Sequence, residues 1–128
     1  MAGKNSQPEF RKLIVDIKVR DLKRAADFYE NILGLTVIDV GSGWASLKAL
    51  GAEIHLYLHG GAENGLEFRV AEIEKQVKTL KSRGVKFFIE PNQIGLIKIS
   101  GEIMEFSWGK AAYFKDSEGN RLALVEDK

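Results

Sequence analysis

The strongest constraint on the fold is an internal repeat that divides the chain into two similar halves. Five residues of the first half recur in kind 51 positions later: Asp16, Ile17, Lys18, Val19 and Asp21 correspond to Glu67, Phe68, Arg69, Val70 and Glu72. Near the ends of the halves, residues 51–58 (GAEIHLYL) align with residues 119–126 (GNRLALVE). A repeat of this length indicates that each half is one supersecondary unit. The second half carries extra residues at about 92–106.

Hydrophobic periodicity predicts the elements of each half. In the first half, apolar residues alternate with polar ones over residues 12–19, which is typical of a half-buried strand. A helix is expected over 21–33, because Asp21 can cap its start and Gly34 can end it. Three further strands follow, and the second half repeats this order with a helix over 72–83. The strands predicted from the pattern are 12–19, 35–40, 44–50, 52–58, 65–70, 85–91, 96–100, 103–108, 111–115 and 120–126. The sequence therefore predicts an α+β fold.

Composition excludes several classes of function. The 128 residues suffice for one domain with a hydrophobic core, and a net charge of +1 argues against nucleic-acid or anionic-membrane partners. The sequence has no cysteine, so disulfides and thiolate metal ligands are excluded. It contains no apolar run long enough for a transmembrane helix and no apolar signal-peptide core near residue 1. We therefore expect a cytoplasmic protein that binds neither nucleic acid nor membrane.

Two motifs resemble the two ends of a known superfamily. Residues 19–35 (VRDLKRAADFYENILGL) and 113–126 (YFKDSEGNRLALVE) are similar to those of the vicinal-oxygen-chelate proteins, which include glyoxalase I, bleomycin-resistance proteins and extradiol dioxygenases. The resemblance covers about residues 12–126. It implies a single domain, 1–128, with βαβββ modules at about 10–60 and 64–127. Their antiparallel-rich sheets would curl around a shared cleft, with the helices outside.

The resemblance also implies where a metal would be held. Metal-dependent members use four side chains, two from each module, and these positions fall on Ile14, His55, Gly65 and Ala123. Only His55 can ligate a metal, so we expect no cofactor. The alternative is a divalent metal such as Zn, Ni, Mn or Fe, bound at a shifted site by Asp16, His55 and Glu67.

Strand parity, combined with the implied fold, predicts the substrate-binding side chains. The set expected on the cleft face is Asp16, His55, Tyr57, Glu67 and Arg121. His55 is the candidate catalytic residue, as a general base, but it could equally be a hydrogen-bonding residue of a polar cleft. Asp16 and Glu67 could share a proton or neutralise nearby cations. Aromatic residues that could stack on a flat ligand, or serve only in packing, are Trp44, Tyr57, Phe106 and Trp108.

Two classes of function follow, and the sequence does not decide whether the chain is an enzyme. The first is a binder of a small organic molecule without the usual metal site. The second is a glyoxalase- or dioxygenase-like enzyme (a lyase, isomerase or oxygenase) with a shifted metal site or metal-free acid–base chemistry. A domain that has lost its ligand is a third option.

A homodimer is expected as well. The resemblance implies it, and the extra segment contains the apolar residues Ile94, Leu96, Ile97, Ile99, Ile103, Met104, Phe106 and Trp108. A hairpin with so much apolar surface should pack on something, either a second copy or its own cleft as a lid.

Overall fold

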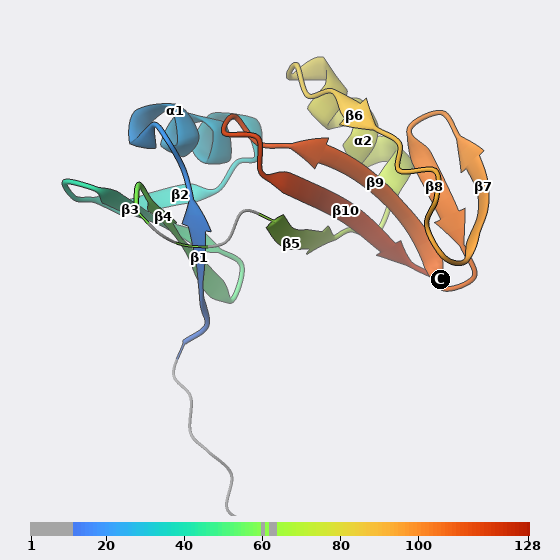
Figure 1. The fold of residues 1–128 in the computed structure, drawn as a ribbon, viewed down its shortest axis with the longest axis horizontal. Coiled ribbons are helices and arrows are strands. Elements are labelled where there is room, and N and C mark those ends of the chain that lie inside the picture. Colours follow the sequence, from blue (N-terminus) through green and yellow to red (C-terminus); the bar gives the residue numbers. More distant parts are fainter. Residues whose placement is uncertain (1–11, 60, 62–63) are drawn as a thin grey trace, which may run out of the picture.

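The computed structural model describes residues 12–59, 61 and 64–128, which form two open β-sheets and two helical segments (Figure 1). The strand order is β1-β4-β3-β2 in the first sheet and β5-β10-β9-β8-β7 in the second, where β6 also pairs with β9. The predicted α+β class with two βαβββ modules is confirmed. The expected start and end of the first module, residues 10 and 60, lie outside the described residues, as do residues 62–63 before the second module.

The first module follows the predicted order, with one change in its helix. Its elements are β1 (Ile14–Lys18), α1 (Leu22–Asp27), the π-helical segment η1 (Phe28–Ile32), β2 (Thr36–Val40), β3 (Trp44–Ala49) and β4 (Ala52–Tyr57). Asp21 caps α1 as expected, because its carboxylate accepts a hydrogen bond from Arg24 N at 3.0 Å. The expected single helix changes to a π-turn at its end, where Leu33 N donates to Phe28 O at 3.2 Å.

The second module consists of β5 (Asn64–Arg69), α2 (Ile73–Ser82), β6 (Phe87–Phe88), β7 (Leu96–Ser100), β8 (Ile103–Phe106), β9 (Gly109–Lys115) and β10 (Arg121–Asp127). The strand expected over 85–91 is reduced to the two residues of β6, and Pro91 cannot donate to a ladder. Neither helix is long and apolar enough to cross a bilayer, among the residues that the structure describes.

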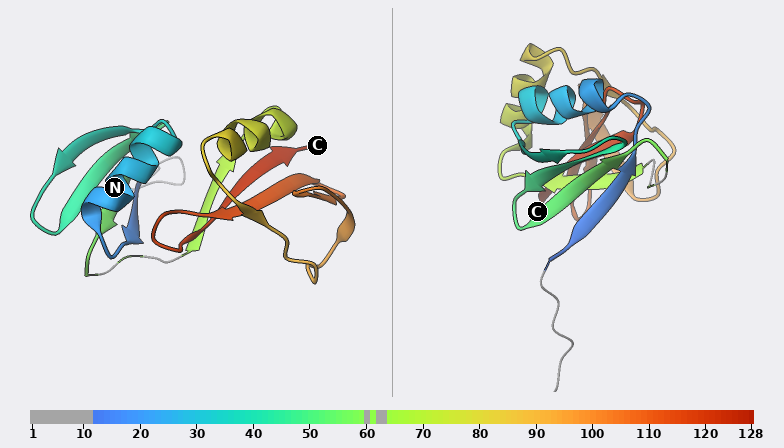
Figure 2. Two further views of the ribbon diagram at one scale, coloured as in Figure 1. Left: turned by 90° about the horizontal axis from the view of Figure 1, so that it is seen from above. Right: turned by 90° about the vertical axis from the view of Figure 1, so that its left-hand side faces the viewer.

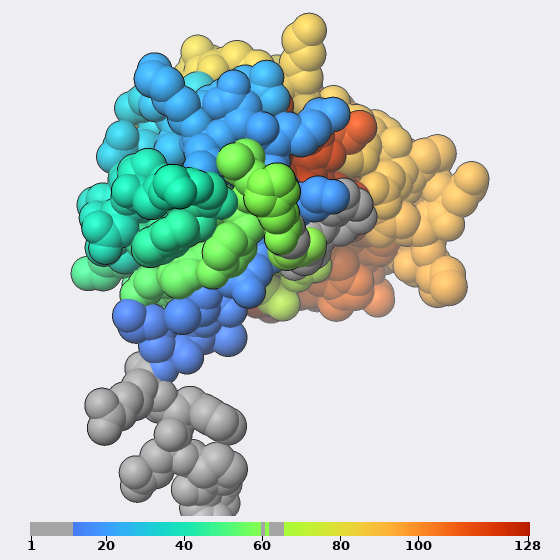
Figure 3. All heavy atoms as spheres, turned by 60° about the vertical axis from the view of Figure 1, so that its left-hand side comes forward, coloured from blue at the N-terminus to red at the C-terminus, as the bar shows by residue number. Residues whose placement is uncertain are grey.

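One hydrophobic core joins the helix-facing sides of both sheets. It contains Ile17 of β1, Leu56 of β4, Phe114 of β9 and Leu124 of β10, together with apolar residues of both helices. Both helices lie on the same side of the molecule (Figures 1 and 2), and α1 lies above the first sheet in Figure 3. The predicted alternation is thus confirmed, because odd residues of β1 and even residues of β4 and β10 face the helices. The opposite side of the first sheet carries polar side chains, whereas that of the second sheet also carries a second apolar cluster that includes Tyr113, Ala123 and Val125.

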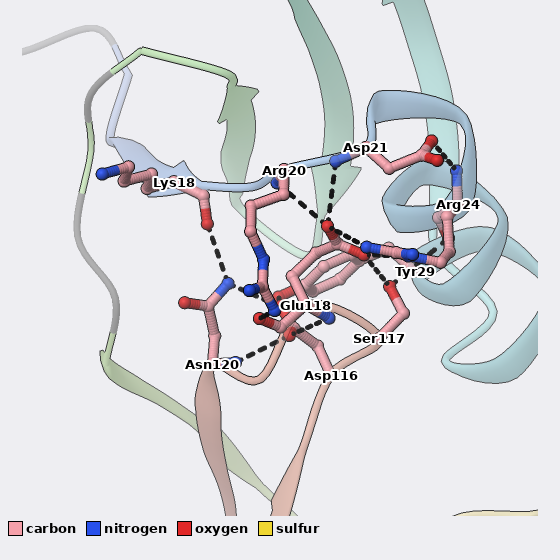
Figure 4. Close-up of polar contacts among 9 residues, drawn as sticks. All are labelled: Lys18, Arg20, Asp21, Arg24, Tyr29, Asp116, Ser117, Glu118 and Asn120. Atoms are coloured by element: carbon pink, nitrogen blue, oxygen red, sulfur yellow. Dashed lines mark hydrogen bonds and ion pairs between the residues drawn. The ribbon is translucent and has the colours of Figure 1, made fainter.

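A polar junction holds the two modules together at the turn between β9 and β10 (Figure 4). The Glu118 carboxylate accepts hydrogen bonds from Arg20 N and Asp21 N, each at 2.9 Å, at the start of α1. Arg24 donates to the same carboxylate from Nε at 2.6 Å and from Nη2 at 2.9 Å. Tyr29 Oη donates to Asp116 at 2.8 Å. This turn therefore sets how the second module lies against α1.

Candidate functional site

The side of the first sheet opposite α1 brings together a compact set of polar and aromatic side chains. We call it the His55 face, and it comprises Asp16, Trp44, Ser46, Glu53, His55 and Tyr57. The ladder places Asp16 beside His55 and His55 beside Ser46, while Tyr57 lies beside Trp44. Because β1 pairs in parallel with β4, the polar residues of both strands line up in register.

His55 is held by side chains on both of its ring nitrogens. Its Nε2 lies 3.0 Å from Glu53 Oε1, and its Nδ1 lies 3.4 Å from Tyr57 Oη. Since the ionised carboxylate can only accept, Nε2 carries the shared proton, and Nδ1 of the neutral ring accepts from the tyrosine hydroxyl. This arrangement orients the imidazole and leaves it partly accessible from the sheet surface.

Glu53 links this face to the start of the described chain. Its carboxylate forms an ion pair with Lys12 as well as the contact with His55. The Lys12 ammonium, and after it the His55 imidazole, holds the pKa of the Glu53 carboxyl below its ordinary value. Glu53 is therefore ionised near neutral pH and favours a proton on Nε2 of His55.

Three aromatic rings follow one another across the face. The Trp44 and His55 ring centroids are 5.6 Å apart, and those of His55 and Tyr57 are 6.1 Å apart. The Trp44 indole lies directly against Gly41, where any Cβ would overlap the ring. A glycine at this position thus leaves room for the indole beside the imidazole, to which it is tilted by 41°. The rings are tilted to one another by 41° and 59°, so the row offers several aromatic faces beside the Asp16 and Glu53 carboxylates.

The corresponding side of the second sheet, which we call the Arg121 face, has a closed polar network. Arg121 contacts the Glu90 carboxylate through Nε at 2.5 Å and Nη2 at 3.0 Å. Gln93 donates to Glu90 at 2.9 Å and accepts from Tyr113 Oη at 3.0 Å. The Arg121 guanidinium lies 4.2 Å from the Tyr113 ring centroid. Glu90 raises the pKa of Arg121, and Arg121 lowers that of Glu90.

The five predicted binding residues divide between the two faces. Asp16, His55 and Tyr57 come together on the His55 face, whereas Glu67 and Arg121 belong to the Arg121 face. Glu67 lies beside Ala123 in the ladder and is exposed.

Some site residues were not predicted as such. Glu53 was not among the predicted binding residues, although it shares the strand parity of His55 in β4. Glu90 and Gln93 lie in an irregular loop without periodicity, and the alternation around Tyr113 gives no hint of its partners.

The residues present do not fit the metal site of the superfamily. Ile14, Gly65 and Ala123 have no donor atoms in their side chains, and Ala123 is buried in a second apolar cluster. Within the described ranges, no group of three or more His, Asp or Glu side chains is placed as a metal site would need.

Comparisons with known proteins agree with this fold. The family model described as Glyoxalase/Bleomycin resistance protein/Dioxygenase superfamily matches residues 13–124. No curated protein gives a significant match.

Solved structures resemble the chain over almost its whole length. TnmS3, an antibiotic binding protein from Streptomyces sp. CB03234, has a TM-score of 0.69 at 22% identity, with 96% of this chain and 100% of that one covered. Lactoylglutathione lyase from Agrobacterium tumefaciens has a TM-score of 0.73 at 14% identity, covering 94% and 96%. A superfamily member from Sphaerobacter thermophilus DSM 20745 has a TM-score of 0.71 at 23% identity, covering 93% and 98%.

Proposed function

This chain belongs to the glyoxalase/bleomycin resistance protein/dioxygenase superfamily, and we propose that it binds a small organic molecule on the His55 face without the usual metal. The observation that carries the proposal is the row of Trp44, His55 and Tyr57 rings, fixed by Gly41 and Glu53. A planar ligand can stack on this row, and Asp16 and Glu53 can accept hydrogen bonds at its edge. One structural neighbour is named as an antibiotic binding protein, which is consistent with a binding role.

The Arg121 face could also contact the ligand if the ligand lies between this face and a His55 face. Arg121 and Glu67 would then contribute their charges to binding. Arg121 is already paired with Glu90, so recruiting it would cost the energy of that pair unless the ligand supplies an anion of its own. Glu67 is exposed and can contact a cation or a hydroxyl group. We therefore include both residues in the proposed binding set.

An enzyme with metal-free acid–base chemistry is the second candidate. The contact between His55 and Glu53 favours it, because a carboxylate can orient an imidazole and stabilise its protonated form. Tyr57 or a ligand group would then exchange protons at Nδ1. Turnover that is lost in both His55→Ala and Glu53→Gln, with binding retained, would identify this second function.

We further propose that the protein is a cytoplasmic homodimer. The support for the dimer is exposed apolar surface on the hairpin of β7 and β8. Ile94 is 100% exposed, Ile97 is 61% exposed and Trp108 is 47% exposed, whereas Met104 and Phe106 are buried in the second cluster. A second copy that covered these residues would bury apolar area, and a stable interface needs roughly 1,000 Å². The lack of cysteine fits a reducing compartment.

The binding proposal is tested by a thermal-shift screen of planar organic molecules against metal-depleted protein, followed by calorimetric titration of any hit. His55→Ala and Trp44→Ala should each weaken binding by about tenfold or more, since each removes stacking surface. Lys75→Ala, on the exposed side of α2, serves as the matched control and should bind like the wild type. A ligand whose affinity is the same in all four proteins does not bind at the His55 face.

A further inference from the structure

A second groove lies between the modules, on the helix side of the molecule. It has a volume of about 690 Å³, within the range of small-molecule sites, and is open to solvent. The first module contributes Phe28 and Ile32 of η1, and the second module contributes residues 83–88 and the end of β9. The His55 face, on the opposite side of the first sheet, takes no part in it. Nothing in the proposed function uses this groove.

The floor of the groove is apolar and aromatic. Phe28 and Ile32 are partly buried against the main core, as is Phe87, whose ring lies 5.4 Å from that of Phe114. Phe28 and Ile32 are the two ends of the π-helical segment. Single π-turns inside helices are rare and are found frequently at functional sites. This segment therefore places two apolar side chains at the groove instead of continuing the α-helix.

The rim of the groove is basic. Arg83, Lys86 and Lys115 line it, and all three are exposed. Arg83 Nη1 donates to Ile32 O at 2.8 Å, across the groove, and Lys115 Nζ lies 5.7 Å from the Phe88 ring centroid. Lys86 forms no hydrogen bond or ion pair with the part of the chain that the structure describes. Thus none of these three cations is neutralised by a carboxylate of the described residues.

The single acidic residue among the lining residues is engaged by neutral hydrogen-bond donors and not by the rim cations. Asp116 is buried, and it accepts hydrogen bonds from Tyr29 Oη, from the backbone N–H of Glu118 and Asn120, and from the Asn120 amide. The surrounding segment 74–86 adds to the positive field, since it contains five Lys or Arg residues and one Glu, against a net charge of +1 for the whole chain.

We propose that this groove is a second binding site, for an aromatic carboxylate. An apolar ring system would cover Phe28, Ile32 and Phe87, and its carboxylate would pair with the rim cations Arg83, Lys86 and Lys115. A neutral ring system would leave the basic rim unpaired, and a small inorganic anion would leave the floor exposed. Because the groove is built from both modules, an occupant would also stabilise their junction.

The test uses 2-naphthoate and its neutral analogue 2-naphthamide as probes in NMR titrations of the full-length protein at physiological ionic strength. Naphthoate should shift the amide signals of residues 28–33 and 83–88 and bind about tenfold more tightly than naphthamide. Combined Lys86→Glu and Lys115→Glu substitutions should reduce naphthoate affinity by about tenfold and leave naphthamide affinity unchanged. Both positions are exposed, so the fold is preserved, and the unperturbed spectrum of the variant verifies it.

Lys78→Glu is the matched control. Lys78 belongs to the basic segment 74–86 and lies on α2, but it does not line the groove. Its affinity for naphthoate should stay within about twofold of the wild type, because exposed charges at a distance are screened. Equal binding of the two probes, or no effect of the double charge reversal, would overturn the proposal. Shifts confined to residues 44–57 would place the probe on the His55 face, which would refute the groove site while supporting the proposed function.

Discussion

Replacing Glu118 by Gln should destabilise the protein more than any other single change of a carboxylate to an amide at the module junction. The side chain is 1% exposed and accepts hydrogen bonds from five donors: Arg20 N, Asp21 N, Arg24 Nε, Arg24 Nη2 and Ser117 Oγ. Glutamine has nearly the same shape but turns an NH₂ group toward some of these donors. The variant therefore loses the charge and gains a donor where only acceptors fit.

The pKa of Glu118 gives the size of the effect. The Arg24 hydrogen bonds, aided by the Arg20 and Asp21 N–H groups, lower this pKa from the ordinary 4.5 to about 2, although burial acts in the opposite direction. At 1.36 kcal/mol per pKa unit, this difference corresponds to about 3 kcal/mol of folding free energy near neutral pH. Breaking a buried ion pair by removing one partner costs a similar amount.

The same shift determines how stability depends on pH. Because the folded-state pKa is lowered, the contribution is fully present above about pH 4.5 and is lost as the pH falls toward about 2. Wild-type protein should therefore lose about 3 kcal/mol more than Glu118→Gln over this interval. Urea denaturation followed by circular dichroism, at a series of pH values, measures both quantities.

Glu102→Gln is the matched control. Glu102 is also a glutamate paired with one cation, Lys81, but its side chain is 35% exposed, so its removal should cost less than about 1 kcal/mol. If Glu118→Gln unfolds at the same urea concentration as this control at neutral pH, the junction does not depend on the buried carboxylate. If the free energy of unfolding falls with decreasing pH equally in the wild type and in Glu118→Gln, the reasoning from the pKa is refuted.

Three further predictions concern the site and the assembly. Gly41→Ala should displace the Trp44 indole, because a Cβ at this position would overlap the ring. In a Trp108→Phe background, the fluorescence emission of Trp44 should therefore shift to longer wavelength, and an unchanged emission would contradict this packing. Protein dialysed extensively against metal-free buffer should hold no stoichiometric transition metal by elemental analysis, since Ile14, Gly65 and Ala123 cannot ligate one; about one metal per chain, removed by chelator, would instead indicate a metal site built from other residues. Sedimentation equilibrium should give a dimer of the 14.3 kDa chain that dissociates in Ile97→Asp, and a monomeric wild type would favour the hairpin as a lid.

The predictable part of this fold is the part governed by local patterns. Alternation along β1, β4 and β10 identified which residues face the helices, because a strand has period two. Capping chemistry identified Asp21 at the start of α1. The π-turn at Phe28–Ile32 could not be found this way, since its apolar spacing is compatible with an α-helix and the tertiary packing decides between them.

Contacts between distant segments account for what the pattern missed. Glu118 meets Arg20 across 98 positions of the chain, and nothing in the local sequence pairs them. Arg121 was expected on a polar face, but its partner Glu90 comes from a loop 31 positions away. Parity thus predicts the face on which a side chain lies, whereas its partners depend on how the modules and loops pack.

At position 123, the packing of the second sheet disfavours a metal ligand as strongly as the lack of a donor atom does. Ala123 is 1% exposed and lies among Tyr113, Val125 and Met104 in the second apolar cluster. A glutamate there would put a carboxylate into space filled by apolar side chains, with a desolvation cost of several kcal/mol. The neighbouring Arg121 is already bound to Glu90 and would have to leave it to compensate the new charge. Placing a glutamate at this position would therefore destabilise the second sheet. The aromatic row and the carboxylates of the His55 face do not depend on those positions, so the proposed binding at this face requires no metal.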